Sequence, residues 1–384
     1  MRRVCVVVGS RANYSSIKSV LTAVQAEPAL ELQLVVGASA VLDRYGAVAD
    51  LIESDGFRAI ERVNMIVEGE TPVTMAQSTG LGLLALPTVF ERLRPDVVVT
   101  VGDRFETVAT TVAAAYMNIP IAHTMGGEIT GSIDESIRHA VTKFSHLHFP
   151  ASAGARERIL RLGEPEERVH LVGCPRVDLV AQLVDQPFDE ADMRELEGGV
   201  GAAFKPANPF VLVSQHPVTS EYGAGEAQIN ATLQAVAKLG LPAVVLWPNA
   251  DAGSEDVARG IRKWRERRGD SQMRFYKNLP IATYVKLMSR ASCLLGNSSS
   301  GVREGAYIGT PVVNIGTRQE GRDWGSNVID VGHATEGILE AAEVQARRGR
   351  YSMDTTYGDG GAGPRIAAVL RDIESIPTQK RITY

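Results

Sequence analysis

The fold of this chain is decided by one stretch, Gly296-Asn297-Ser298-Ser299-Ser300-Gly301-Val302-Arg303-Glu304. It follows the apolar run Ala291 to Leu295, which is typical of a buried strand, and leads into a helix predicted over Val302 to Tyr307. Small polar residues at such a turn let backbone N–H groups approach an anion, and the helix start adds partial positive charge. A serine-rich turn is also common as an ordinary helix cap, so this stretch alone leaves both interpretations open.

Bulk composition limits the class of protein. At 384 residues the chain is long enough for two domains, and 44% hydrophobic with 22% charged residues is ordinary for a soluble globular protein. The 40 basic and 45 acidic residues give a net charge of −5, which argues against partners such as nucleic acid or an anionic membrane surface.

The cysteines and the N-terminus indicate a reducing, cytoplasmic setting. Cys5, Cys174 and Cys293 lie in or beside apolar runs and form no CxxC pair, so we expect buried thiols. The chain starts directly with a strand-like run, shows no signal-peptide pattern, and is expected to have no apolar stretch of membrane-spanning length.

Apolar runs alternate with amphipathic segments along almost the whole chain. Continuous β-branched runs without polar alternation predict strands that are covered on both faces, and therefore parallel sheets. The predicted strands are Val4–Val8, Leu32–Val36, Val97–Val101, Ile119–His123, His146–Pro150, Val169–Val172, Phe210–Ser214, Ala243–Pro248, Met273–Tyr276, Ala291–Leu295 and Pro311–Ile315. The predicted helices are Ser16–Gln25, Tyr45–Ser54, Thr74–Arg92, Thr107–Met117, Ile133–Phe144, Ala153–Leu162, Glu226–Leu239, Ser254–Arg267, Ala282–Arg290, Val302–Tyr307 and Arg365–Ile373.

This order predicts an α/β fold with two doubly wound, Rossmann-like domains. We expect an N-terminal domain over residues 1–175 and a C-terminal, nucleotide-binding domain over 205–363. Residues 176–204, rich in charge, Gly and Pro, are expected to connect them. The end of the chain, 364–384, is expected to form a helix that packs back on the first domain.

Polar segments follow the predicted strands, where ligands bind in parallel α/β sheets. If the two domains face each other, these segments line one cleft. Three arginines, Arg11, Arg104 and Arg318, suit a diphosphate because guanidinium forks match phosphate oxygens. Acids and bases for proton transfer are also present, namely Asp103, Glu128, Asp134, Glu135 and His216. The dinucleotide fingerprint and the P-loop pattern are both missing, so a nucleotide-sugar enzyme is the better interpretation.

The motifs, in their order, resemble the UDP-N-acetylglucosamine 2-epimerase family, and most closely its hydrolysing branch that feeds sialic-acid-type sugars. The resemblance spans nearly the whole chain. It rests on eight segments: 9–15 (Gly-Ser-Arg-Ala-Asn-Tyr-Ser), 102–106, 126–139, 173–175, 215–219, 248–254, 296–304 and 316–319.

The resemblance implies a two-domain GT-B fold, a UDP-sugar substrate, no metal, no nicotinamide or other cofactor, and a homodimer. It implies that UDP is held mainly by the C-terminal domain. The residues expected at UDP are Arg11, Ser15, Arg104, His216, Asn249, Asp251, Ser298, Ser299, Gly301, Glu304 and Arg318. Those expected at or near the sugar are Asp103, Glu128, Asp134, Arg138 and His216.

The implied reaction is a 2-epimerisation through a glycal, with Asp103 as the first choice for moving the C2 proton. UDP leaves C1, and re-addition of UDP or water gives UDP-ManNAc, or ManNAc and UDP. Two departures from the family stand out: Ser39-Ala40 replaces a histidine, and Met125 replaces a glutamate. They leave open a UDP-sugar hydrolase or epimerase acting on a modified amino sugar, a GT-B glycosyltransferase, and a non-catalytic UDP-sugar sensor.

Overall fold

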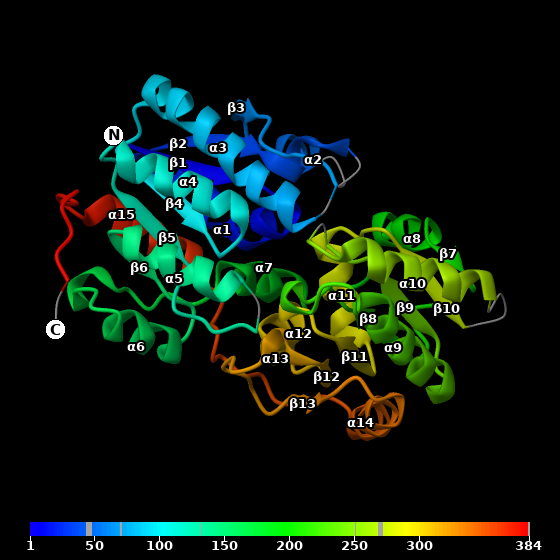
Figure 1. The fold of residues 1–384 in the computed structure, drawn as a ribbon. Helices are drawn as coiled ribbons and strands as arrows, with labels where there is room; N and C mark the ends of the chain where they lie inside the picture. The colour runs from blue at the N-terminus through cyan, green and yellow to red at the C-terminus, as the bar shows by residue number, and fades with distance from the viewer. Residues whose placement is uncertain (44–47, 70, 132, 250, 268–271, 383–384) are drawn as a thin grey trace. The chain divides into compact units, whose positions relative to one another are not determined.

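The structure, a computed structural model, describes residues 1–43, 48–69, 71–131, 133–249, 251–267 and 272–382 (Figure 1). The chain forms two compact units. The N-terminal unit comprises Met1–Ile129, Ile133–Leu179 and Tyr357–Tyr384, and the C-terminal unit comprises Thr130–Ser132 and Val180–Thr356.

A six-stranded parallel sheet forms the middle of the N-terminal unit, in the order β3-β2-β1-β4-β5-β6. From β1 the chain adds strands first on one side (β2, β3) and then on the other (β4, β5, β6). The topological switch point of this doubly wound sheet therefore lies between β1 and β4. The strands pair because their β-branched residues are buried, as in β4, where all five are covered. The strand bounds are β1 Arg2–Val8, β2 Leu30–Gly37, β3 Ala59–Val63, β4 Val97–Val101, β5 Ile121–Thr124 and β6 Leu147–Phe149.

Helices connect these strands, and the last helix of the chain joins the same unit by packing against α1. The Asp178 carboxylate accepts hydrogen bonds from the backbone N–H groups of Ala362 (2.9 Å) and Gly363 (2.7 Å), which opens α15. The helical bounds are α1 Arg11–Ala26, η1 Ala38–Val41, α2 Val48–Ser54, α3 Pro72–Leu93, α4 Phe105–Tyr116, α5 Asp134–Phe144, α6 Ala153–Arg161, η3 Glu166–Arg168 and α15 Ala362–Asp372.

The C-terminal unit holds a seven-stranded sheet in the order β13-β12-β11-β8-β9-β10-β7, in which β7 alone runs antiparallel to its neighbour. Its switch point lies between β8 and β11. Alternate residues of β11 enter the two cores: Cys293 and Leu295 lie in one and Leu294 in the other. The strand bounds are β7 Val200–Gly201, β8 Val211–Ser214, β9 Ala243–Leu246, β10 Met273–Tyr276, β11 Cys293–Gly296, β12 Val312–Ile315 and β13 Val328–Val331.

Helices cover both faces of this second sheet, so the predicted α/β class with two doubly wound sheets is confirmed. The helix α7, Pro175–Leu183, carries the chain out of the N-terminal unit. The remaining helical bounds are α8 Glu190–Glu197, η4 Thr219–Glu221, α9 Gly225–Leu239, α10 Ser254–Arg267, α11 Ile281–Arg290, α12 Ser299–Val302, α13 Glu304–Ile308, η5 Thr317–Gln319 and α14 Thr335–Arg348.

Some local predictions are wrong. The helix predicted over Val302 to Tyr307 is two short helices that break at Arg303. The strand predicted over Val169 to Val172 is a single parallel bridge between His148 and Val169. The elements β3, α7, α8, β7, β13 and α14 were not anticipated. The predicted start of one helix at Tyr45 lies outside the described residues.

The three cysteines are free and buried, as expected. Burial raises the pKa of the Cys5 and Cys293 thiols to about 12, so both remain protonated. One helix among the described residues, α3, has the length and hydropathy of a membrane span, which corrects the expectation that no stretch reaches this length. Its Leu86 and Phe90 nevertheless lie in the core beside the sheet of the N-terminal unit.

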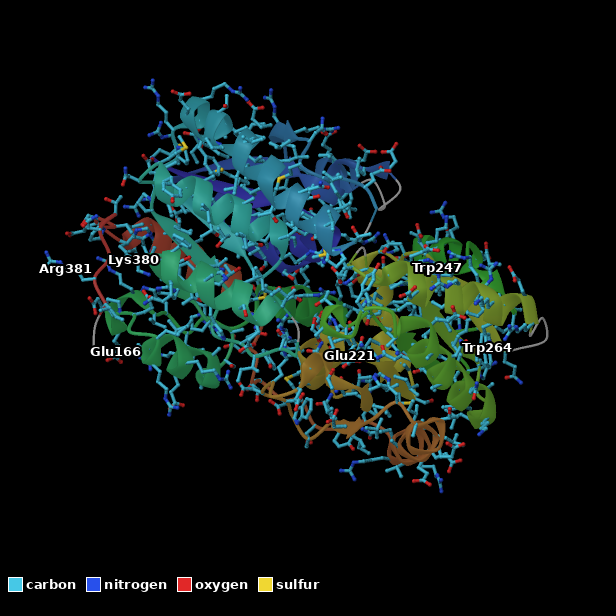
Figure 2. The ribbon with its side chains drawn as sticks, viewed as in Figure 1. Glu166, Glu221, Trp247, Trp264, Lys380 and Arg381 are labelled. Atoms are coloured by element: carbon cyan, nitrogen blue, oxygen red, sulfur yellow. The ribbon has the colours of Figure 1, made fainter. Side chains whose placement is uncertain are left out.

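Beyond α15 the chain returns to the C-terminal end of α5 and to Glu164 through Lys380 (Figure 2). Its ammonium group donates to the main-chain carbonyls of Lys143 (2.9 Å) and Ser145, at the C-terminal end of α5. It also pairs with the buried Glu164 carboxylate at 2.6 Å. The last part of the chain is therefore bonded to the helix that starts with Asp134.

Candidate functional site

In the N-terminal unit, the candidate residues gather where β1 and β4 end. Asn13 joins these two strand ends: its Nδ2 donates to the Val101 carbonyl (3.1 Å), and its Oδ1 accepts from the Gly9 N–H (3.3 Å). Ser10 caps α1, so Arg11 stands in the first turn of that helix. The hydroxyl of Ser15 donates to the Arg11 carbonyl one turn earlier (3.0 Å), so its hydrogen is used within α1.

Arg104 follows β4, and its Nε donates to the Glu106 carboxylate at 3.0 Å. Glu106 is only 3% exposed and lies across Gly9, where an added Cβ would stand 2.3 Å from the Glu106 Cγ. A side chain at position 9 would therefore displace the acid that holds Arg104. Glu106 was not among the predicted site residues, although it belongs to the segment 102–106 that carried the resemblance.

Three of the predicted sugar-site residues meet at one guanidinium. Arg138 is completely buried; its Nη2 donates to the Asp103 carboxylate, and its Nη1 donates to the Glu128 carbonyl (2.6 Å) and to Glu135 (3.3 Å). The Asp103 side chain remains 22% exposed. Asp134 opens the same helix, α5, and is half-buried. The arrangement places an accessible carboxylate against a fixed positive charge at the end of β4.

The turn that presents Asp103 is held by a hydrogen bond from the buried side chain of His123. Its Nε2 donates to the Gly102 carbonyl at 2.8 Å, and its Nδ1 lies 3.3 Å from the Thr142 hydroxyl. Burial lowers the pKa of His123 to about 3, so the ring is neutral at physiological pH. Gly102 itself adopts a left-handed conformation, with φ of 70°, which favours glycine.

Neither position at which the sequence departs from the family offers a group for proton transfer. Met125 is 5% exposed, and its sulfur lies 3.7 Å from the Cys174 sulfur. Ala40 is completely buried, and its N–H donates to the Gly9 carbonyl at 3.2 Å. Both residues therefore act in packing beneath the strand ends.

In the C-terminal unit, candidate residues follow β8, β9, β11 and β12. The serine turn, Ser298–Ser300, is tied together by its own hydroxyls: Ser298 Oγ lies 2.9 Å from Ser300 Oγ, which lies 2.6 Å from the Tyr284 hydroxyl. Ser299 starts α12, and Gly301 packs this helix against Val312. Behind the turn, Glu304 is 1% exposed and opens α13.

His216 follows β8, and its ring orientation is set by the neighbouring strand end. The Asn249 N–H donates to His216 Nδ1 at 3.1 Å, so this nitrogen is an acceptor. A neutral ring must then carry its proton on Nε2, which makes Nε2–H a donor for a ligand. Asp251 contributes main-chain bonds here, donating to the Asn249 carbonyl and accepting from the Ser254 N–H before α10.

Arg318 follows β12, and its Nη1 donates to the main-chain carbonyl of Asn297 at 3.2 Å. Gln319, completely buried, donates to the same oxygen at 2.8 Å. Asn297 and Gln319 were missed as individual site residues. The signal that could have found Asn297 is its position in the serine-turn segment, directly after an apolar strand.

Each unit thus carries hydrogen-bond donors where its strands end, and the N-terminal unit adds the partly exposed Asp103 carboxylate. Within the described residues, no three His, Cys, Asp or Glu side chains are grouped to hold a metal ion. The donors suit an anion such as a diphosphate, since guanidinium, imidazole and hydroxyl groups all donate to phosphate oxygens.

Comparisons with known proteins agree on one family. Residues 22–371 match the family described as UDP-N-acetylglucosamine 2-epimerase. The hydrolysing UDP-N,N′-diacetylbacillosamine 2-epimerase of Legionella pneumophila is 31% identical, over 97% of this chain and 96% of that protein. A UDP-N-acetylglucosamine 2-epimerase of Neisseria meningitidis is 26% identical, over 99% of this chain and 98% of that protein.

Solved structures agree on the fold. The N. meningitidis UDP-GlcNAc 2-epimerase bound to UDP-GlcNAc has a TM-score of 0.79 at 20% identity, over 96% of this chain and 99% of that one. The enzyme of Methanocaldococcus jannaschii with UDP-GlcNAc and UDP also scores 0.79, at 16% identity and with the same coverage. The two Rossmann-like units are thus of the GT-B type, and this chain belongs to the UDP-N-acetylglucosamine 2-epimerase family.

Proposed function

We propose that the protein is a 2-epimerase that acts on a UDP-linked 2-acetamido sugar by eliminating UDP to a glycal. The observation that carries the proposal is the partly exposed Asp103 carboxylate, held by the buried Arg138 at the end of β4. A base in this position can take a proton from a ring carbon while the guanidinium keeps the carboxylate oriented. Family membership supports the same reaction class.

The chemistry requires a leaving group because the C2 proton is not adjacent to a carbonyl. The Asp103 carboxylate takes the C2 proton, the C2–H electron pair becomes the C1=C2 double bond, and the C1–O bond breaks. The electrons of that bond pass to the β-phosphate oxygen of UDP. Re-addition across the double bond needs a proton at C2 from the opposite side, for which Glu128 and Asp134 are the candidates, and UDP or water at C1.

Stabilising the departing diphosphate is the task we assign to the C-terminal unit. The His216 Nε2–H, the hydroxyls and N–H groups of Ser298 and Ser299, and the Arg318 guanidinium can all donate to phosphate oxygens. Glu304 is proposed to accept from a ribose hydroxyl, and Gly301 to allow close approach of the backbone. The Asn249 N–H sets the His216 ring. Further contacts to the nucleotide are proposed for Arg11, Ser15, Arg104, Asn249 and Asp251.

A single experiment tests reaction and substrate together. The protein is incubated in heavy water with UDP-GlcNAc, and separately with UDP-N,N′-diacetylbacillosamine, the substrate in the name of the Legionella relative. Proton NMR is expected to show deuterium at C2 of the product and free UDP. Asp103→Asn is expected to abolish both signals. Product that keeps protium at C2 rules out the elimination, and turnover that needs an added acceptor indicates a glycosyltransferase instead.

The name of one relative favours a modified amino sugar as the natural substrate. The Legionella pneumophila relative, which is 31% identical to this chain, is named for UDP-N,N′-diacetylbacillosamine. The 2-epimerisation step itself is unchanged in this alternative, and only the groups at C4 and C6 of the sugar differ. The relative rates on the two substrates above decide between them.

We also propose that the protein is a homodimer joined through α3 and α4, which pack against each other. Residues 72–90 and 107–118 contain no charged side chain. Val73, Leu84 and Tyr116 on these helices are 64%, 78% and 85% exposed. A two-fold interface places the same surface on both partners, so an uncharged apolar face suits a second copy of this chain.

A further inference from the structure

Asn297 has an unusual pattern of bonds for a residue in a turn. It is completely buried; its Oδ1 accepts from the His216 N–H (2.7 Å), and its Nδ2 donates to the His216 carbonyl (2.9 Å). One side-chain amide thus satisfies both main-chain groups of a single residue. The regular β11–β8 ladder ends with Gly296 opposite Ser214, and the Asn297 N–H still reaches the Ser214 carbonyl at 3.2 Å. The side chain therefore extends the ladder by one step.

The main chain of the same residue bonds to the next strand end. The Asn297 carbonyl accepts from both Arg318 Nη1 (3.2 Å) and Gln319 Nε2 (2.8 Å), which follow β12. Because β8, β11 and β12 are neighbours in the sheet, a single residue links the carboxyl ends of all three. Ser298, the next residue along the chain, begins the serine turn.

We propose that Asn297 is the positioning residue of the anion site: it fixes His216, the serine turn and Arg318 as one rigid set of donors for the diphosphate. The inference rests on the proposed function, since it assumes a nucleoside diphosphate as the ligand. Asn297 is not itself assigned a contact to the ligand. Donors that are already in place bind an anion without a reorganisation cost, which is the advantage of such a link.

The link also controls which nitrogen of His216 carries the proton. Asn297 holds the His216 main chain, and with it the ring, where Nδ1 accepts the Asn249 N–H. Loss of the amide frees the main chain of His216 to move, so the two neutral tautomers exchange. Only one of them presents Nε2–H to a phosphate oxygen.

A matched control exists in the same unit. Gln345 on α14 is also completely buried, and its Nε2 donates to the carbonyls of Val312 (2.7 Å) and Asn327 (2.9 Å). These carbonyls lie at the N-terminal ends of β12 and β13, whereas Asn297 follows the C-terminal end of β11. Gln345→Ala therefore removes a comparable buried amide far from the proposed donors.

The binding test compares Asn297→Ala with Gln345→Ala in the full-length protein, using UDP as the probe. Asn297→Ala is expected to raise the dissociation constant for UDP, measured by calorimetry, by about tenfold or more, because several donors are displaced together. Gln345→Ala is expected to lower the melting temperature at least as much as Asn297→Ala does. Its dissociation constant for UDP is expected to stay within about twofold of that of the original protein. Asn297→Ser, which leaves a smaller cavity, serves if the alanine variant does not fold.

The second measurement needs no ligand. In protein with ¹⁵N-labelled histidine, the His216 ring signals, assigned by their loss in His216→Gln, are expected to show a protonated Nε2 and an unprotonated Nδ1. In Asn297→Ala or Asn297→Ser these signals are expected to average between the two tautomers. Unchanged ring signals, or unchanged UDP affinity in a folded variant, overturn the proposal. If the original protein binds no UDP, the proposed function fails, and the ring signals alone still decide the positioning role.

Discussion

Arg138 is completely buried, and its guanidinium donates to the carboxylate of Asp103, which lies 35 residues earlier in the chain and is partly exposed. The same guanidinium holds the Glu128 carbonyl and the Glu135 carboxylate. One cation thus ties together the turn after β4, the segment after β5 and the first turns of α5. The proposed base is positioned by a group that solvent does not reach.

Replacing Arg138 with lysine keeps the charge but loses this geometry. An ammonium group cannot serve Asp103, Glu128 and Glu135 together in the way the planar fork does. Arg138→Lys is therefore expected to lower kcat at least about a hundredfold and the free energy of unfolding by about 3 kcal/mol. Initial rates of UDP release and urea denaturation measure the two effects.

The control for this prediction is Arg156→Lys. Arg156 pairs with the exposed Glu166 at 2.6 Å, so the same substitution there is expected to change stability by less than about 0.5 kcal/mol. Full activity in Arg138→Lys would show that Asp103 needs no such support, and the assignment of Asp103 as an oriented base would then lose its basis.

Met125 tests whether the departure from the family can be reversed by substitution. Because Met125 is 5% exposed and its sulfur packs against the Cys174 sulfur, Met125→Glu buries a carboxylate at an apolar position. We expect the variant to lose about 2 kcal/mol or more of stability and to gain no activity. Met125→Leu, which keeps the volume, is the control and is expected to change stability by less than about 1.5 kcal/mol. Faster turnover in Met125→Glu would mean that this position does reach the sugar.

The sequence predicted those strands that are buried on both faces and missed those that are partly exposed. Strands that are covered on both faces, such as β1 and β4, leave continuous β-branched runs, and these were recognised. The edge strand β13 is only half-buried and carries Asp330, so its apolar signal is weak and it was missed. The break between α12 and α13 at Arg303 depends on how the turn packs, which a helical periodicity does not encode.

The same distinction holds for the site. Residues in motif segments, such as Asp103, Ser298 and Arg318, could be chosen because polar groups after buried strands carry a local signal. Asn297 could not be given its role in this way, because its partner His216 lies 81 residues away and the bond is to the main chain. Long-range contacts of this kind become visible only when strand order and register are known.

His123 provides a prediction on pH. Burial lowers its pKa from 6.5 to about 3, so the folded state favours the neutral ring while the unfolded chain takes up a proton below pH 6.5. The stability that depends on this ring is therefore complete above pH 6.5 and is lost as the pH falls toward 3. His123→Gln is expected to be less stable than the original protein at pH 7, by an amount that shrinks between pH 6.5 and 4.5. Chemical denaturation across this range measures the difference, and a constant gap would contradict the prediction.

The Lys380–Glu164 pair also makes a contribution to stability that is lost at low pH, but through an acid. Burial alone would raise the pKa of Glu164, but hydrogen bonds from His148, Lys143 and Lys380 lower it to about 2. Its stabilisation is thus present above pH 4.5 and is lost as the pH falls toward 2. Lys380→Met is expected to cost about 2 kcal/mol or more at pH 7 and progressively less below pH 4.5. The adjacent, exposed Arg381 gives the control, Arg381→Met, which is expected to change stability by less than about 0.5 kcal/mol at any pH.

The proposed dimer face is tested by Leu84→Glu on α3, where the side chain is 78% exposed. In a two-fold interface the new carboxylate is desolvated on both copies without a partner of opposite charge, so we expect the dimer to dissociate at micromolar protein concentration. Val344→Glu on α14, at a position 53% exposed, is the control and is expected to leave the assembly unchanged. Sedimentation velocity distinguishes the two variants. If the Leu84→Glu protein sediments as a dimer, the interface lies on another surface. If the original protein is monomeric, the proposed homodimer is wrong, and the apolar face of α3 and α4 needs a different partner.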